Sequence, residues 1–152
     1  MLRSICAALA CLLFVPSIFG FNLDPLSADL KLKKGEKHEL LFRIKNIYKE
    51  PIIIEVSAID KAAVHENTEE QAQKPIWITK IRPERLRLDK DKYTYLTAII
   101  MVPQDSGDSL SAEIIFKVSG SKKKSKVDKT VAVPVSVTIN ADKKAGKTNT
   151  EK

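Results

Sequence analysis

Cysteine, histidine and glycine are all scarce in this sequence. Its two cysteines, Cys6 and Cys11, lie near the start, so the remaining chain has no thiol for a disulfide, a nucleophile or a metal site. The two histidines, His38 and His65, have no histidine or cysteine beside them, and the five glycines form no phosphate-binding loop. We therefore expect no enzyme: no catalytic residues, no cofactor, no metal and no small-molecule substrate.

The first twenty residues have the order of a secretory signal peptide. Arg3 gives a positive start, an unbroken apolar run covers Ile5–Val15, and the small residues Ser17 and Gly20 follow. The run is shorter than the roughly 20 residues of a membrane-spanning helix, although a retained anchor helix and a lipoprotein site at Cys11 remain alternatives. A cysteine-free exported domain without an N-glycosylation sequence fits a bacterial envelope. We predict that residues 1–20 are a Sec-type signal peptide and that the protein is periplasmic or secreted.

Residues 21–140 alternate between apolar and polar side chains with the period of β-strands. Candidate strands cover residues 26–32, 40–44, 52–58, 76–81, 86–88, 93–102, 110–118 and 131–139. Residues 93–102 are β-branched and aromatic, which predicts a well-buried strand, and Trp77 can face the core or the solvent. The pattern predicts one all-β domain over residues 21–140, an immunoglobulin-like β-sandwich of seven to eight strands, with a closed barrel as the alternative.

Two polar segments lie outside this pattern. Asp60–Lys74 is a loop or a short helix, in which Glu66, Glu69 and Glu70 near His65 could bind a cation, although a solvated loop explains them equally well. Residues 141–152 contain no apolar residue except two alanines and are predicted to be a disordered basic tail.

The last predicted strand alternates without a miss between β-branched and other residues. Its β-branched members are Val131, Val133, Val135, Val137 and Ile139. Pro134 cannot donate a ladder hydrogen bond and so favours the edge of a sheet. We predict that these five residues bind a strand of a protein partner, because strand addition uses an open sheet edge. The alternative is that this face packs the domain's own core.

A run of lysines precedes that strand, in a chain whose net charge is +7. It consists of Lys122, Lys123, Lys124, Lys126 and Lys129. Such a run predicts a patch for an anionic partner, which could be a phosphate-bearing lipid, an envelope polymer or an acidic protein. We expect no nucleic acid, because no aromatic residues are interleaved. The alternative is a solvated loop that keeps the neighbouring edge soluble.

Short motifs occur along the chain in a fixed order. They are Phe21–Pro25, Lys34–Glu36, Ile44–Asn46, Pro51 before an isoleucine-rich strand, Ile81–Leu88, Val102–Asp105 and Asp108–Phe116. Together they resemble the amino-terminal immunoglobulin-like domain of PapD-type periplasmic chaperones, the proteins that assemble pili. The likeness spans residues 23–139. It implies an immunoglobulin-like fold and a protein partner held through an edge strand.

The chain also departs from that family. The family has a second domain, and this chain ends where that domain would begin. The last predicted strand of this sequence has no basic residue after Lys129, so the family's carboxylate-binding anchor is not carried over. We therefore predict a single-domain relative, an exported chaperone-like module that holds an envelope or pilus-type subunit through an edge strand. The alternative is a structural envelope protein that self-associates or docks on anionic wall material through the lysine run.

Overall fold

A computed structural model describes residues 20–61 and 75–140, and the regular structure of these residues is entirely β-strand. The predicted signal peptide and the predicted tail lie outside the described residues, except for Gly20. Residues 62–74, with His65 and its acidic neighbours, also lie outside them. In the described part of the chain, no helix is long and apolar enough to cross a bilayer.

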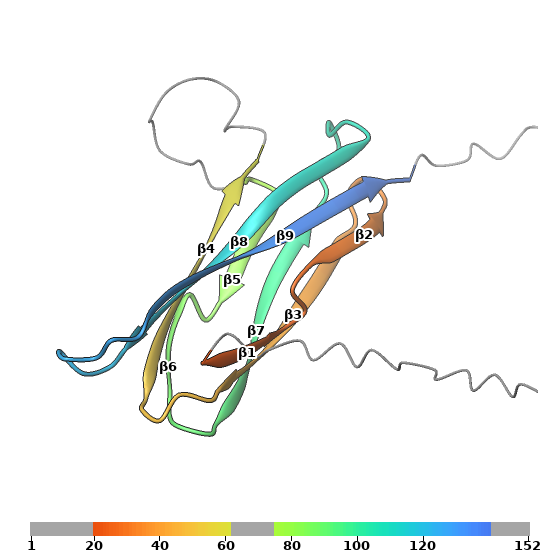
Figure 1. The fold of residues 1–152 in the computed structure, drawn as a ribbon. Helices are drawn as coiled ribbons and strands as arrows, with labels where there is room; N and C mark the ends of the chain where they lie inside the picture. Colours follow the sequence, from red (N-terminus) through yellow and green to blue (C-terminus); the bar gives the residue numbers. More distant parts are fainter. Residues whose placement is uncertain (1–19, 62–74, 141–152) are drawn as a thin grey trace, which may run out of the picture.

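The described residues form nine strands in two facing sheets (Figure 1). The strands are β1 (Phe21–Asp24), β2 (Ala28–Leu32), β3 (Lys37–Asn46), β4 (Ile52–Asp60), β5 (Ile78–Arg82), β6 (Arg85–Leu88), β7 (Tyr93–Met101), β8 (Ser109–Gly120) and β9 (Asp128–Ile139). Sheet A has the order β1-β3-β7-β5, and sheet B has the order β2-β9-β8-β4-β6. The predicted all-β immunoglobulin-like sandwich is confirmed, with one strand more than the largest number expected.

The additional strand is β1, because the first candidate strand of the sequence pattern began only at residue 26. β1 pairs antiparallel with the end of β3 in sheet A, and β2 pairs parallel with the end of β9 in sheet B. Pro25 lies between them, where a residue without an N–H group can end a strand. Leu26, predicted to begin a strand, lies in this crossing and is 59% exposed. One short stretch of chain therefore covers part of the edge of each sheet.

The core lies between the sheets, where the alternating apolar residues meet. Phe42 of β3 and Phe116 of β8 are fully buried, and their rings meet edge to face with 5.3 Å between centroids. Trp77 is 2% exposed, so the structure has the buried one of its two possible orientations, while the preceding Ile76 is 83% exposed. Burying a side chain as large as phenylalanine contributes about 1.5–3 kcal/mol. The contact between Phe42 and Phe116 is therefore a principal source of stability.

Strand β7 was expected to be well buried, but it is buried on one face only. Leu96, Ala98 and Ile100 point into the core, whereas Tyr93 is 57% and Tyr95 is 50% exposed. The prediction was wrong on this point because a β-branched, aromatic composition does not reveal whether one or both faces of a sheet are covered. Among the described residues, the inner face of sheet A packs against sheet B, and no other sheet covers the outer face of sheet A.

Candidate functional site

The two halves of β9 have different neighbours. On one side, β9 pairs antiparallel with β8 along nearly its whole length. On the other side, β2 pairs only with Val135–Ile139. Among the described residues no strand pairs with that side of Asp128–Pro134, which we call the open edge (Figure 1).

The direction of the backbone groups in β9 follows from hydrogen bonds at its end. The N–H of Ile139 donates to the carbonyl of Asp108 beside β8, at 2.9 Å. The N–H of the next residue, Asn140, donates to the carbonyl of Leu32 in β2, also at 2.9 Å. The pairing with β8 runs without a register shift. Because the direction alternates along a regular strand, odd-numbered residues of β9 face β8 and even-numbered residues face β2 or the open edge.

The open edge therefore presents the backbone groups of Asp128, Thr130 and Ala132, each with one N–H donor and one carbonyl acceptor. Pro134 has no N–H group, and its carbonyl faces β2 at Ala28, where the parallel pairing begins. Pro134 pairs in register with Glu113 of β8. Its missing N–H costs no hydrogen bond to β8, because it points to the uncovered side.

The side chains of the five predicted partner-binding residues lie on the inner face of β9. Val133 and Val135 are fully buried, Val137 is 1% exposed, and Ile139 is 8% exposed. Val131 is partly buried against the same core. These side chains pack the domain's own core, which was the alternative that the sequence left open. What β9 leaves available is its backbone at the open edge, and partner binding by this strand stays a prediction.

The lysine run forms a hairpin loop that is shorter than the sequence indicated. β8 continues to Gly120 and β9 begins at Asp128, so residues 121–127 make the β8–β9 loop. Its exposed lysines are Lys122, Lys123, Lys124 and Lys126. Lys129, predicted to belong to the loop, lies inside β9 and is half-buried. The strands extend further than predicted because β8 and β9 stay paired as far as Ser119 and Asp128.

The β8–β9 loop is attached to the turn of residues 47–51. The N–H of Ser121 donates to the carbonyl of Pro51 at 3.1 Å. The Ser125 hydroxyl hydrogen-bonds to the carboxylate of Glu50, and its Oγ accepts the N–H of Val127 at 3.1 Å. These bonds give the base of the basic loop a defined conformation beside that turn.

Replacing Ser125 by alanine should loosen this loop without unfolding the domain. The variant loses two hydrogen bonds, each with a net contribution of about 1 kcal/mol, so amide exchange of residues 121–127 should accelerate roughly 30-fold. Hydrogen exchange read by mass spectrometry measures this directly. Ser119→Ala, at an exposed position of β8, is the matched control. Equal exchange rates in the two variants would contradict the attachment.

Asn46, the last residue of β3, connects two turns and was not predicted from the sequence. It is fully buried. Its Nδ2 donates to the carbonyls of Leu88 and Glu50, at 3.0 and 2.9 Å, and its Oδ1 accepts the N–H of Tyr48 at 2.9 Å. Its backbone also bonds to Asp91 and Lys92 in the next turn. Asn46 therefore fixes the position of the turn of residues 47–51 relative to that of residues 89–92.

A signal for Asn46 was present in the sequence. It continues the inward-facing alternation of Leu40, Phe42 and Ile44, and a polar side chain at an inward position must find hydrogen-bond partners. The candidate strand ended at residue 44, so the inward position of Asn46 was not predicted.

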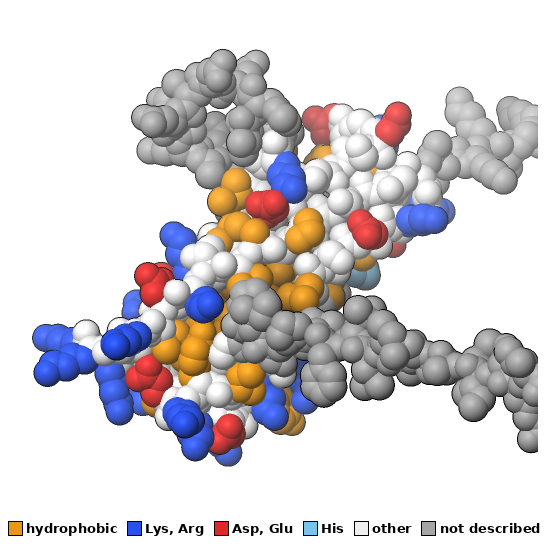
Figure 2. Space-filling model, viewed as in Figure 1, with side chains coloured by type: hydrophobic (Ala, Val, Ile, Leu, Met, Phe, Trp, Pro, Cys, Tyr) orange, Lys and Arg blue, Asp and Glu red, His pale blue; other side chains and the backbone are white. Residues whose placement is uncertain are grey.

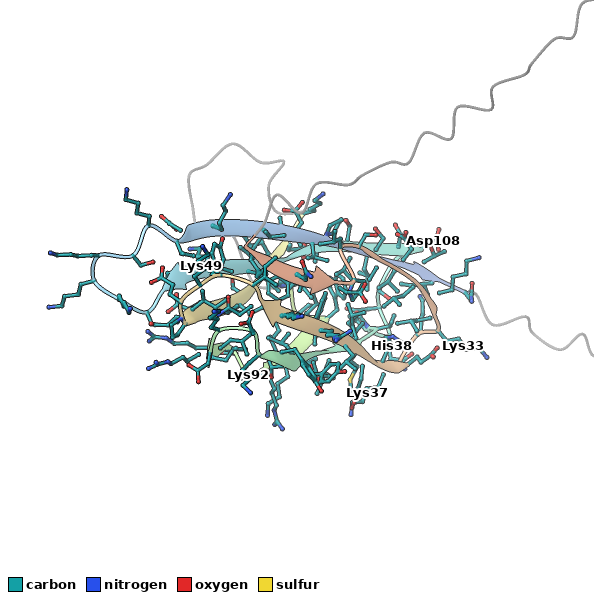
Figure 3. The ribbon with its side chains drawn as sticks, turned by 60° about the horizontal axis from the view of Figure 1, so that its bottom comes forward. Lys33, Lys37, His38, Lys49, Lys92 and Asp108 are labelled. Atoms are coloured by element: carbon teal, nitrogen blue, oxygen red, sulfur yellow. The ribbon has the colours of Figure 1, made fainter. Side chains whose placement is uncertain are left out.

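The remaining chemistry-bearing side chains do not converge. His38 lies near the start of β3, at the end of the sandwich opposite Lys49 (Figure 3). In the part of the chain that the structure describes, no group of three or more His, Cys, Asp or Glu side chains is placed to hold a metal ion.

No protein-family model and no curated protein sequence matches this chain. Solved structures are similar to it. The periplasmic chaperone SfaE has a TM-score of 0.60 at 10% identity, over 80% of this chain and 59% of its own. A PapD-like domain of human CEP192 has a TM-score of 0.60 at 10% identity, over 91% of this chain and 97% of its own. The Escherichia coli chaperone DraB has a TM-score of 0.58 at 12% identity, over 81% of this chain and 56% of its own.

The chain thus spans a little over half the length of these two chaperones and nearly the whole CEP192 domain. Identities of 10–12% carry information about the fold alone. The fold is nevertheless the immunoglobulin-like one that the sequence motifs implied. The described residues have the PapD-like immunoglobulin fold.

Proposed function

We propose that this protein is an exported, chaperone-like module that holds an envelope or surface-appendage subunit by pairing a strand of that subunit with the open edge of β9. The observation that supports this most directly is the uncovered backbone of Asp128–Pro134. Strand addition of this kind uses main-chain hydrogen bonds for affinity. Similar structures include complexes of chaperones with their subunits, such as SafA pilin with the SafB chaperone, at 12% identity and a TM-score of 0.59 over 82% of this chain and 56% of that one.

The small number of hydrogen-bonding groups at the open edge favours a complex from which the subunit can be released. The open edge offers the N–H groups and carbonyls of Asp128, Thr130 and Ala132. Each backbone hydrogen bond contributes a net of about 1 kcal/mol, so a few bonds and the accompanying side-chain contacts give modest affinity. A carrier that later releases its subunit needs an interaction of that strength.

Replacing Ala132 by proline should weaken partner binding while the domain stays folded. The N–H of Ala132 faces the open edge, as position 134 does, where the native residue is already proline. The substitution removes one of the three donors and should weaken capture of the subunit about tenfold. Co-purification of the subunit from the native envelope measures the effect, and Ala132→Ser, which keeps the N–H group, is the matched control. A proline variant that captures its subunit as well as the serine variant does would contradict the proposal.

Photo-crosslinking tests the same site without weakening it. A photoreactive side chain at Ala132 should crosslink to the subunit, whereas one at Ser136 should not, because β2 covers the edge there. Both residues are exposed on the same strand. Crosslinks of equal yield at the two positions would place the partner elsewhere. Charged substitutions at Val133 or Val135 are not suitable tests, because both side chains are fully buried and the domain would unfold.

A further inference from the structure

One end of the sandwich carries a group of lysines from three different turns, which we call the basic end. Its members are Lys49, Lys92, Lys122, Lys123, Lys124 and Lys126, and all are exposed. Figure 2 shows the Lys and Arg side chains gathered where the β8–β9 loop projects from the body. Figure 3 places Lys49 and Lys92 on that side, opposite Lys33 and Lys37.

The positive charge of the basic end is largely uncompensated. Two nearby aspartates are paired with other cations: Asp89 with Arg87 at 3.5 Å, and Asp91 with Lys90 at 3.7 Å. The carboxylate of Glu50 is bonded to the Ser125 hydroxyl. Among the described residues, the six lysines of the basic end form no salt bridge. They are therefore available to an external anion.

The three turns are held together by the hydrogen bonds already described. Asn46 links residues 89–92 to residues 47–51. Ser121 and Ser125 link residues 47–51 to the β8–β9 loop. The lysines are thus displayed on a preorganised frame, and less backbone entropy is lost on binding than for a flexible lysine run.

Two side chains suited to a membrane interface lie at the same end. Tyr93, directly after Lys92, is 57% exposed, and Ile47, directly after Asn46, is 37% exposed. A tyrosine has an apolar body with a polar tip, and tyrosines are enriched where membranes meet water. The cations come from three separate turns and form no single line along one strand. This spread matches an extended layer of charged headgroups better than it matches one polymer strand.

From this arrangement we propose that the basic end docks the protein on an anionic phospholipid surface. The binding is peripheral and electrostatic: lysines near the surface are attracted to anionic headgroups, and added salt weakens the attraction. The site is separate from the open edge, so this proposal does not depend on the proposed capture of a subunit.

Sedimentation of the full chain with lipid vesicles tests the proposal. The protein should bind vesicles of phosphatidylcholine containing about one third phosphatidylglycerol, should bind vesicles of phosphatidylcholine alone far more weakly, and should be released by high salt. Substituting glutamine at Lys122, Lys123 and Lys124 together should lower partitioning to the anionic vesicles on the order of 100-fold.

The matched control substitutes glutamine at Lys31, Lys34 and Lys80, which are exposed and lie outside the basic end. It changes the net charge equally, and partitioning should fall by less than about threefold. Equal losses in the two triple variants would overturn the proposal, because net charge alone would then govern binding. Equal binding to neutral vesicles would also overturn it. So would polyphosphate binding that is as tight per phosphate as vesicle binding, since the ligand would then be a polymer. Circular dichroism verifies that both variants are folded.

Discussion

Replacing Phe116 by alanine is expected to destabilise the domain by about 3–5 kcal/mol, a large part of the stability of a typical domain. Phe116 is fully buried in sheet B, and its ring meets that of Phe42 from sheet A at 5.3 Å between centroids. The variant loses this burial and leaves a cavity between the sheets. Urea unfolding followed by circular dichroism measures the change.

A double-mutant cycle isolates the contact between the two rings. Phe42→Ala and Phe116→Ala together should cost less than the sum of the single changes, with a coupling of about 0.5–1.5 kcal/mol. Leu41→Ala is the matched control on the same strand, because Leu41 faces outward and is 53% exposed. A Leu41 variant as unstable as the Phe42 variant would mean that the inner and outer faces of β3 have been assigned wrongly.

Replacing Asn46 by alanine should cost about 3 kcal/mol, because the buried partners of its amide lose their hydrogen bonds. The carbonyl of Leu88 is the most affected, since its bond to Asn46 is buried. The same unfolding measurement applies. The second expected effect is faster amide exchange in residues 47–51 and 89–92, which Asn46 holds together.

Two substitutions calibrate the Asn46 prediction. Asn22→Ala changes the same residue type at an exposed position of β1 and should alter stability by less than about 0.5 kcal/mol. Asn46→Asp keeps the acceptor for Tyr48 but replaces the Nδ2 donor by a carboxylate, so it should be at least as destabilising as alanine. If Asn46→Ala were as stable as Asn22→Ala, the turns of residues 47–51 and 89–92 would not depend on this side chain.

The sequence was informative wherever an element is defined by local alternation. The period of two in β3, β8 and β9 identified which residues face the core. The same pattern missed β1, because this strand has only four residues and its place depends on pairing with the end of β3. Ile76 looked like part of a strand, yet β5 begins only at Ile78. A side chain just before a strand need not follow the alternation within it.

The candidate site depended on a pairing that no local pattern contains. Five alternating β-branched residues identified β9 as a notable strand, but they could not show that Ala28–Leu32 would cover half of its edge. Nor could they decide between core packing and partner binding, because an apolar face suits both. Pro134 was the more direct signal, since a proline within a strand points its missing donor toward an uncovered side.

The split between β1 and β2 also affects the order in which the domain folds. β1 pairs with β3 a short distance along the chain, whereas Ala28 must wait for Val135 near the end of the domain. Sheet B therefore cannot be completed until these two distant segments meet, and contacts between residues so far apart in sequence slow the closing step. Until then the backbone groups of β2 have no partner strand, and the partly folded chain is most exposed to mispairing with other chains.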